Sequence, residues 1–197
     1  MPSPYRASVR HEHLLRELVD IFLAEGFADV SLSGMAGRLH CSKSTLYAIA
    51  PSKEQMIVAV VREFFRVATV RVEASLVPAL APRDQLDAYL VAISHQLAPA
   101  SAAFFADLSA FAPAREIYAM NTKIAAQRVQ DLVRAAKFDE AKGPDAAFVG
   151  TVAGLVMEAI HRGEIEATTG FDDSYAYRAL AELIVAGLSG PIEKDSA

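Results

Sequence analysis

The sequence predicts an all-α protein of two domains. Apolar residues recur at three-to-four spacing through most of the 197 residues, and no stretch of useful length alternates as a half-buried strand does. Glycine, proline and short hydroxyl or acidic residues separate the periodic stretches, as expected at helix ends. We therefore expect a small helical domain over residues 1–52, a long connecting helix over 53–78 and a larger helical domain over 79–197.

The first helix is predicted over residues 9–23, where leucine, valine, isoleucine and phenylalanine fall on one face. It stops at Gly26, because glycine can adopt the left-handed conformation that ends helices. A short second helix follows, with Ser31 or Ser33 as its N-cap and Leu39 near its end.

A tight break at His40 separates this helix from a third, which Ser42 caps and which extends to about Ile49. Two short helices joined by such a turn form a helix-turn-helix unit, whose second helix lies in the major groove of DNA. A groove-entering helix needs short polar side chains that reach phosphates or base edges, and this one supplies Lys43, Ser44, Thr45 and Tyr47. The alternative is that these are capping and surface residues of an unrelated small bundle.

The fourth helix is predicted over residues 52–76, after Pro51. Ser52 caps it, and Gln55 stands three residues later, as in a capping box. Its length allows it to join two domains. Lys53 lies at its N-terminus, where an ammonium and free backbone N–H groups together could hold a phosphate.

The second domain begins after Pro78 and Pro82 and contains five further periodic stretches. The last two mix broad apolar surface with small residues, which let helix axes approach closely. Packing inside one chain would explain the same composition. The predicted helices span residues 84–97, 102–111, 114–138, 145–162 and 173–188.

Charge and composition narrow the function class. Residues 1–71 carry nine Lys and Arg against seven Asp and Glu, whereas the rest carries ten against seventeen, and such asymmetry is typical of a polyanion-binding end. The single Cys41 excludes an internal disulfide or a thiolate zinc site, and it suits a reducing compartment. No apolar run spans a bilayer and none resembles a secretory signal. We expect a cytoplasmic protein without cofactor or metal, and not an enzyme, since no nucleophile–base constellation is visible.

These features together resemble a known family. The run LVDIFLAEGFADVSLSGMAGRLHCSKSTLYAIAPSKEQMIVAV, residues 18–60, is similar to the DNA-binding domain of TetR-family transcriptional regulators. The matching pieces are the apolar helix ending in EGF, the Ser-Leu pair, the Met-Ala pair, then SKSTLY, PSKE and a long apolar helix. The resemblance implies a helix-turn-helix domain joined to a helical ligand-binding and dimerisation domain.

Carried over by position, the resemblance implies that residues 42–47 form the recognition helix, with Tyr47 and Lys53 contacting phosphates. His40 stands where the family usually has glycine, so we expect a non-glycine residue at positive φ. Ile49 and Ala50 replace a usual aromatic, which removes packing beneath the recognition helix. The candidate DNA-binding residues are Ser33, Ser42, Lys43, Ser44, Thr45, Tyr47 and Lys53.

Two further sites are predicted in the second domain. Aromatic and flexible residues between the long helix and the last two helices predict a mostly apolar effector pocket, although core packing explains the same residues: Tyr89, Phe104, Phe105, Phe111, Tyr118, Asn121 and Met157. The resemblance places the last two helices at a twofold interface, formed by Val152, Val156, Ile160, Leu180, Leu183, Ile184 and Leu188.

The predicted function is a repressor of transcription that a small apolar or aromatic effector releases from operator DNA. Its partners would be double-stranded DNA, the effector and a second copy of the chain, with no membrane. The alternative is a dimeric helical interaction or small-molecule-binding protein without sequence-specific DNA binding.

Overall fold

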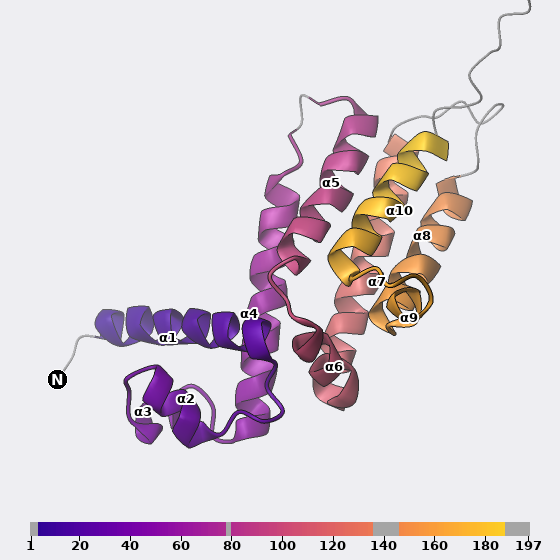
Figure 1. The fold of residues 1–197 in the computed structure, drawn as a ribbon. Helices are drawn as coiled ribbons and strands as arrows, with labels where there is room; N and C mark the ends of the chain where they lie inside the picture. The colour runs from indigo at the N-terminus through magenta and orange to yellow at the C-terminus, as the bar shows by residue number, and fades with distance from the viewer. Residues whose placement is uncertain (1–3, 78–79, 136–145, 188–197) are drawn as a thin grey trace, which may run out of the picture. The chain divides into compact units, whose positions relative to one another are not determined.

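The computed structural model describes residues 4–77, 80–135 and 146–187, and the regular secondary structure within them is all α-helix, which confirms the predicted fold class (Figure 1). The chain divides into two compact units. Unit 1 comprises residues 1–68 and 99–118, and unit 2 comprises residues 69–98 and 119–197. The fourth and seventh helices each continue from one unit into the other.

Unit 1 contains the predicted helix-turn-helix. Ser31, not Ser33, caps the second helix, since its side chain accepts a hydrogen bond from Gly34 N. Gly26 ends the first helix with a φ of 77°, as predicted. The helices of this unit are α1 (Pro4–Glu25), α2 (Leu32–Arg38), α3 (Lys43–Tyr47), the first part of α4 (Lys53–Ala74), α6 (Ala102–Ala110) and the start of α7 (Ala112–Ala135).

The core of unit 1 joins residues that are far apart in sequence. Phe27, from the α1–α2 connection, packs its ring edge-on against Phe104 of α6, with ring centroids 6.1 Å apart. Phe64 of α4 makes a similar contact with Phe104 at 5.7 Å. Burying such large apolar side chains is the main favourable term in folding. The core of unit 1 therefore includes α6 as well as the N-terminal helices.

Unit 2 is built around α10. Its helices are the end of α4, α5 (Pro82–Leu97), the rest of α7, α8 (Ala146–His161), α9 (Glu164–Thr169) and α10 (Asp173–Gly187). Helix α10 packs against α5 and α8 (Figure 1). The buried hydroxyl of Ser94 donates to the carbonyl of Ser174, 2.8 Å away, and joins α5 to α10. Gly150 lets α8 approach α7, because an added Cβ would lie 2.7 Å from Cβ of Gln130.

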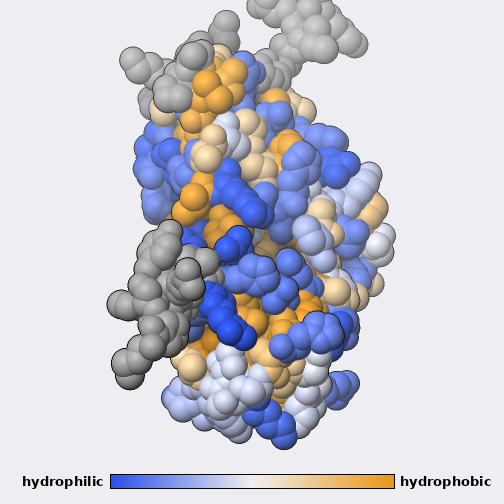
Figure 2. Space-filling view, turned by 90° about the vertical axis from the view of Figure 1, so that its left-hand side faces the viewer, coloured by the Kyte–Doolittle hydropathy of each residue, from blue (hydrophilic) through white to orange (hydrophobic). Residues whose placement is uncertain are grey.

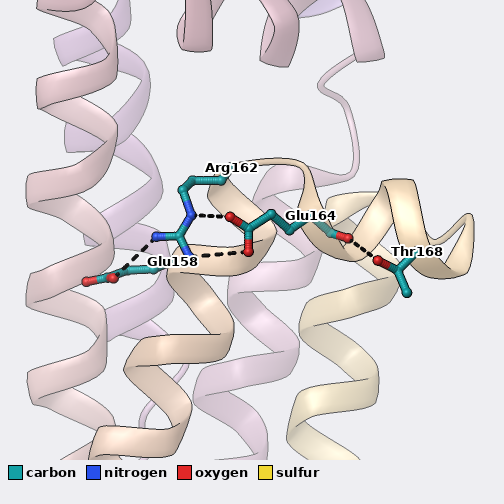
Figure 3. Close-up of polar contacts among 4 residues, drawn as sticks. All are labelled: Glu158, Arg162, Glu164 and Thr168. Carbon is teal, nitrogen blue, oxygen red and sulfur yellow. Dashed lines mark hydrogen bonds and ion pairs between the residues drawn. The ribbon is translucent and has the colours of Figure 1, made fainter.

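Helix α9 was not predicted. Its six residues, EIEATT, carry no apolar periodicity that would have predicted a helix, and none of them is buried. Local polar contacts hold it instead: the Arg162 guanidinium lies 2.6 Å from Glu164 and 3.7 Å from Glu158, and Thr168 donates to the Glu164 carbonyl (Figure 3). The hydrogen bond with Arg162 lowers the pKa of Glu164. The other helix ends agree with prediction within about two residues, except that α1 begins at Pro4 instead of residue 9. The predicted ends at residues 138, 145 and 188 lie outside the described residues.

One face of the molecule is mainly polar. Figure 2 shows one face on which hydrophilic residues predominate, interrupted by smaller hydrophobic patches. Among the described helices, none is both long enough and apolar enough to cross a bilayer. The described histidine, cysteine and acidic side chains likewise form no cluster that could hold a metal ion.

Candidate nucleic-acid interface

The start of α3 is fixed by its own hydroxyl groups. Ser42 Oγ accepts a hydrogen bond from Thr45 N at 3.2 Å and so satisfies a donor that the first helical turn leaves open. The same oxygen lies 2.7 Å from Ser44 Oγ and 2.8 Å from Thr45 Oγ1. These contacts give Ser42 a capping role and order the two neighbouring hydroxyl groups before any ligand arrives.

Opposite faces of α3 have opposite character. Leu46 is fully buried and anchors the helix to unit 1, as Met35 does for α2. Lys43, Ser44 and Tyr47 are exposed, and 47% of Tyr47 is accessible to solvent. The helix therefore presents a lysine, a serine and a tyrosine outward from a buried base.

The turn between α2 and α3 contains the strained residue that the sequence predicted. His40 has a φ of 46°, the only positive value among the described residues other than glycine. The backbone turns back on itself here, because Cys41 N donates to the carbonyl of Ala36 at 3.0 Å. Left-handed geometry at a non-glycine residue persists only where surrounding contacts enforce it.

Two basic residues of this unit are engaged within the protein. The Lys53 ammonium donates to the Ala28 carbonyl at 2.6 Å and so reaches the α1–α2 connection. The Arg38 guanidinium binds the Glu25 carboxylate through two nitrogens, one of them 2.7 Å from Oε2. That hydrogen bond lowers the pKa of Glu25 below its ordinary value of 4.5.

Comparison of sequences alone finds no relative, since no family model and no curated protein matches the chain. Solved structures do match. A TetR-like transcriptional regulator from Rhodococcus sp. RHA1 is 18% identical with a TM-score of 0.62, covering 96% of this chain and 99% of its own. A TetR-family regulator from Agrobacterium tumefaciens is 12% identical with a TM-score of 0.66, covering 91% and 97%. FadR from Bacillus subtilis, in complex with stearoyl-CoA, is 13% identical with a TM-score of 0.62, covering 90% and 98%.

This chain has the TetR-like fold. The likeness extends over both units, although the sequence resemblance covers only the helix-turn-helix and the start of α4. The assignment therefore rests on the arrangement of helices, not on shared residues.

Within the TetR-like fold, the residues predicted to line an effector pocket divide between the two units. Tyr89, Asn121 and Met157 belong to unit 2, and the other four, Phe104, Phe105, Phe111 and Tyr118, belong to unit 1. The unit 1 side chains make ring contacts with each other and with the core, such as the stacking of Tyr118 on Phe65 at 5.3 Å. Their role as pocket residues stays a prediction, and their contacts in this structure are those of a packed core.

A groove of about 350 Å³ lies in unit 1. It lies between the N-terminal half of α4 and the corner that joins α6 to α7. Among the predicted pocket residues only Phe111 lines it, beside Glu54, Gln55, Val58, Ala59, Arg62 and Pro113.

Two polar side chains in the interior of unit 2 stand out. Thr122 is 4% exposed, and its hydroxyl has no hydrogen-bond partner among the described residues. Tyr89 is also buried, and burial followed by the nearby Glu73 charge raises the pKa of its phenol. Glu73 itself pairs with Arg128, 3.2 Å away. Sequence reasoning missed Thr122, because a threonine inside a helix gives no sign of whether its hydroxyl is satisfied.

The residues predicted at a dimer interface differ in exposure. Leu183 of α10 is 67% exposed, and Val152 and Val156 of α8 are half-buried. Ile160, Leu180 and Ile184 are buried within unit 2, and Leu188 lies outside the described residues. Phe148 and Leu155 of α8 are also exposed and apolar, and being seven residues apart they share one face of the helix. Leu155 was not among the apolar residues considered for the interface.

Proposed function

We propose that this protein is a ligand-responsive transcriptional regulator that binds double-stranded operator DNA as a homodimer. The observation that carries the proposal is α3, a short helix anchored by buried Leu46 while Lys43, Ser44 and Tyr47 face outward. A helix held in this way can enter the major groove as a rigid body. The similar structures, which are transcriptional regulators, support the same class.

The candidate DNA-binding residues are proposed to have three roles: contact with bases, contact with phosphates, and capping of α3. Lys43 and Ser44 are proposed to meet base edges, and Tyr47 to bind a phosphate. Lys53 is proposed to bind a second phosphate, for which it must leave the Ala28 carbonyl. Ser42 acts mainly through the cap, so its contribution to DNA binding is to hold α3 in shape. Thr45 is half-buried and Ser33 exposed, and both stay candidate contacts.

Dimerisation would bring two recognition helices to two half-sites. The exposed leucines Leu155 and Leu183 lie on α8 and α10, two helices that pack against each other. Exposed apolar side chains on neighbouring helices are typical of a surface that a partner covers. A symmetric pairing of these helices as a four-helix bundle fits that surface.

The effector is proposed to enter unit 2 and release the DNA. The unpartnered hydroxyl of Thr122 supports a ligand there, because a buried polar group without a hydrogen bond costs about 1–3 kcal/mol that a polar atom of the ligand would recover. The largely apolar interior suits a small apolar or aromatic effector. Release from DNA then requires that the effector bind the free protein more tightly than it binds the DNA complex.

The first experiment tests DNA binding. Duplexes are selected from a random-sequence library by the full chain, and affinity for a selected and a scrambled duplex is measured by fluorescence anisotropy. Lys43→Ala is expected to weaken the selected duplex about tenfold, as loss of one base contact does. Lys123→Ala, which removes the same charge from an exposed position of unit 2, is the matched control and should change affinity little. No selected sequence, or equal effects of the two variants, would favour the dimeric interaction protein without sequence-specific DNA binding.

The second experiment tests the phosphate role of Lys53. Lys53→Ala should weaken binding to both duplexes and reduce the slope of log affinity against log salt by about one. An unchanged slope would mean that Lys53 acts only through its bond to the α1–α2 connection.

The third experiment tests the ligand site. A fragment library is screened by thermal shift with the full chain, and the fragments that bind are measured again with Thr122→Val. Valine keeps the volume and removes the hydroxyl, so the free variant should be as stable as the parent or more stable. Fragments that use the hydroxyl should bind more weakly, and a set of binders that is indifferent to Thr122→Val would place the effector elsewhere.

A further inference from the structure

A carboxylate on α6 holds the connection between α1 and α2. Asp107 Oδ2 accepts hydrogen bonds from Phe27 N at 2.5 Å and from Ala28 N at 2.8 Å. Asp107 lies about 80 residues away from them in sequence. An ionised acceptor makes these bonds stronger than neutral ones.

Three neighbouring contacts hold the same part of the chain, two from α6 and one from α4. The ring of Phe27 packs against Phe104 of α6, and Ser101 N, at the start of α6, donates to the Leu23 carbonyl near the end of α1 at 2.8 Å. From α4, the Lys53 ammonium donates to the Ala28 carbonyl. The backbone of residues 27–28 is therefore held from α6 by a carboxylate and from α4 by an ammonium.

The backbone fits closely around this carboxylate. Gly26 has a φ of 77°, and a Cβ added there would overlap Asp107 Oδ2 and lie 3.1 Å from the Ala103 carbonyl oxygen. Gly26, which has no side chain, is thus the residue that lies directly against α6. Glycine at this position lets the chain pass close enough for its next two amides to reach Asp107.

The held segment leads directly into the DNA-facing helices. Three residues after Ala28 the chain reaches Ser31, the N-cap of α2, and α2 is fixed to the end of α1 by the pairing of Arg38 with Glu25. A shift of residues 27–28 would therefore move α2, and α3 with it.

We propose that Asp107 is a positioning residue for DNA recognition: from α6 it sets where the α1–α2 connection, and hence the helix-turn-helix, lies. It touches no DNA itself. This inference rests on the proposed function, since it concerns how the recognition helix is oriented.

The test uses Asp107→Asn in the full chain, which keeps the shape and an acceptor oxygen but removes the charge. The matched control is Glu116→Gln, which removes the same charge from an exposed position on α7 in unit 1. Removing a negative charge by itself favours DNA binding slightly, so loss of the charge and loss of position have opposite signs.

The measured quantity is the ratio of affinities for the selected and the scrambled duplex, at a temperature well below unfolding. Asp107→Asn is expected to lower this ratio about tenfold while the scrambled duplex binds at least as well as to the parent. Glu116→Gln should leave the ratio unchanged. Because partial unfolding lowers both affinities together, a change in their ratio separates positioning from a loss of folded protein.

A second measurement does not depend on DNA. Hydrogen exchange at the amides of Phe27 and Ala28 should be faster in Asp107→Asn than in the parent, and unchanged in Glu116→Gln. Faster exchange with an unchanged affinity ratio would overturn the positioning role and leave the proposed function intact. A parent protein that prefers no DNA sequence would overturn both.

Discussion

Replacing Gly26 with alanine should destabilise the protein through two separable effects. The first is backbone strain, since an L-residue in left-handed geometry costs about 1–2 kcal/mol. The second is steric: the new Cβ overlaps Asp107 Oδ2 and approaches the Ala103 backbone, so Asp107 must move and its two hydrogen bonds weaken. Charge-assisted bonds contribute about 1.5–3 kcal/mol each. Partial loss of both adds about 2–4 kcal/mol, giving a total of about 3–6 kcal/mol.

Gly170 is the control for the first effect alone. Its φ of 75° nearly equals that of Gly26, but an added Cβ would meet nothing within 4 Å. Gly170→Ala should therefore lower the free energy of unfolding only by the backbone strain, about 1–2 kcal/mol. The free energy of unfolding is measured by urea denaturation at pH 7 and equal protein concentration, followed by circular dichroism.

Removing the carboxylate completes the comparison. In an Asp107→Ala background, most of the steric effect of Gly26→Ala should disappear, because the Asp107 side chain no longer overlaps the new Cβ. The loss in free energy of unfolding should then approach that of Gly170→Ala. Equal losses for Gly26→Ala and Gly170→Ala in the parent would refute the argument. Full additivity of Gly26→Ala with Asp107→Ala would show that the two sites are not in contact.

Three further predictions concern assembly, acid stability and signalling. Leu183→Glu should produce monomers in analytical ultracentrifugation, since an unpaired charge buried at the interface costs several kcal/mol, whereas Val70→Glu, at an exposed position of α4, should remain dimeric; a dimeric Leu183→Glu would place the interface elsewhere. Because pairing with Arg38 lowers the pKa of Glu25, that pair stabilises the fold above the ordinary pKa of 4.5 and the contribution is lost as pH falls below it, so urea midpoints of Glu25→Gln should change less between pH 5 and 3 than those of the parent, and parallel profiles would contradict this. If α4 carries the effector signal to the DNA-binding helices, Ala68→Phe, at a buried position of α4, should change operator affinity without altering a DNA-facing side chain, and a folded dimeric variant with parental affinity and ligand response would exclude α4 as the route of the signal.

Features set by neighbours in sequence were predictable. The cap at Ser42 and the stop at Gly26 depend on backbone geometry within about four residues, and the structure has both. The same reasoning narrowed the cap of α2 to Ser31 or Ser33, whereas the positive φ of His40 was implied by the family resemblance, which has glycine at that position. A cap needs only the next turn of its own helix. Short-range patterns therefore predicted most helix ends within about two residues, and they missed α9 because that helix buries no residue.

Long-range partners were beyond such reasoning. Nothing near Asp107 in sequence indicates that it binds amides of the α1–α2 connection, and Lys53 reads equally well as a phosphate ligand or as the partner of a carbonyl. Periodicity also shows which residues share a helix face but not what covers that face. Ile184 and Leu183 were predicted together, yet one is buried in unit 2 and the other is exposed.

The internal bonds of Arg38 and Lys53 bear on how the protein would find its operator in a cell. Attraction to random DNA comes almost entirely from basic groups that displace counterions, and these two are already engaged with Glu25 and with a carbonyl. Since residues 1–71 carry a net charge of only +2, from nine Lys and Arg against seven Asp and Glu, such attraction should be weak. Search would then proceed by short encounters separated by free diffusion, not by long sliding along the chromosome. Most unbound copies would be in solution, where an effector can reach them before they return to DNA.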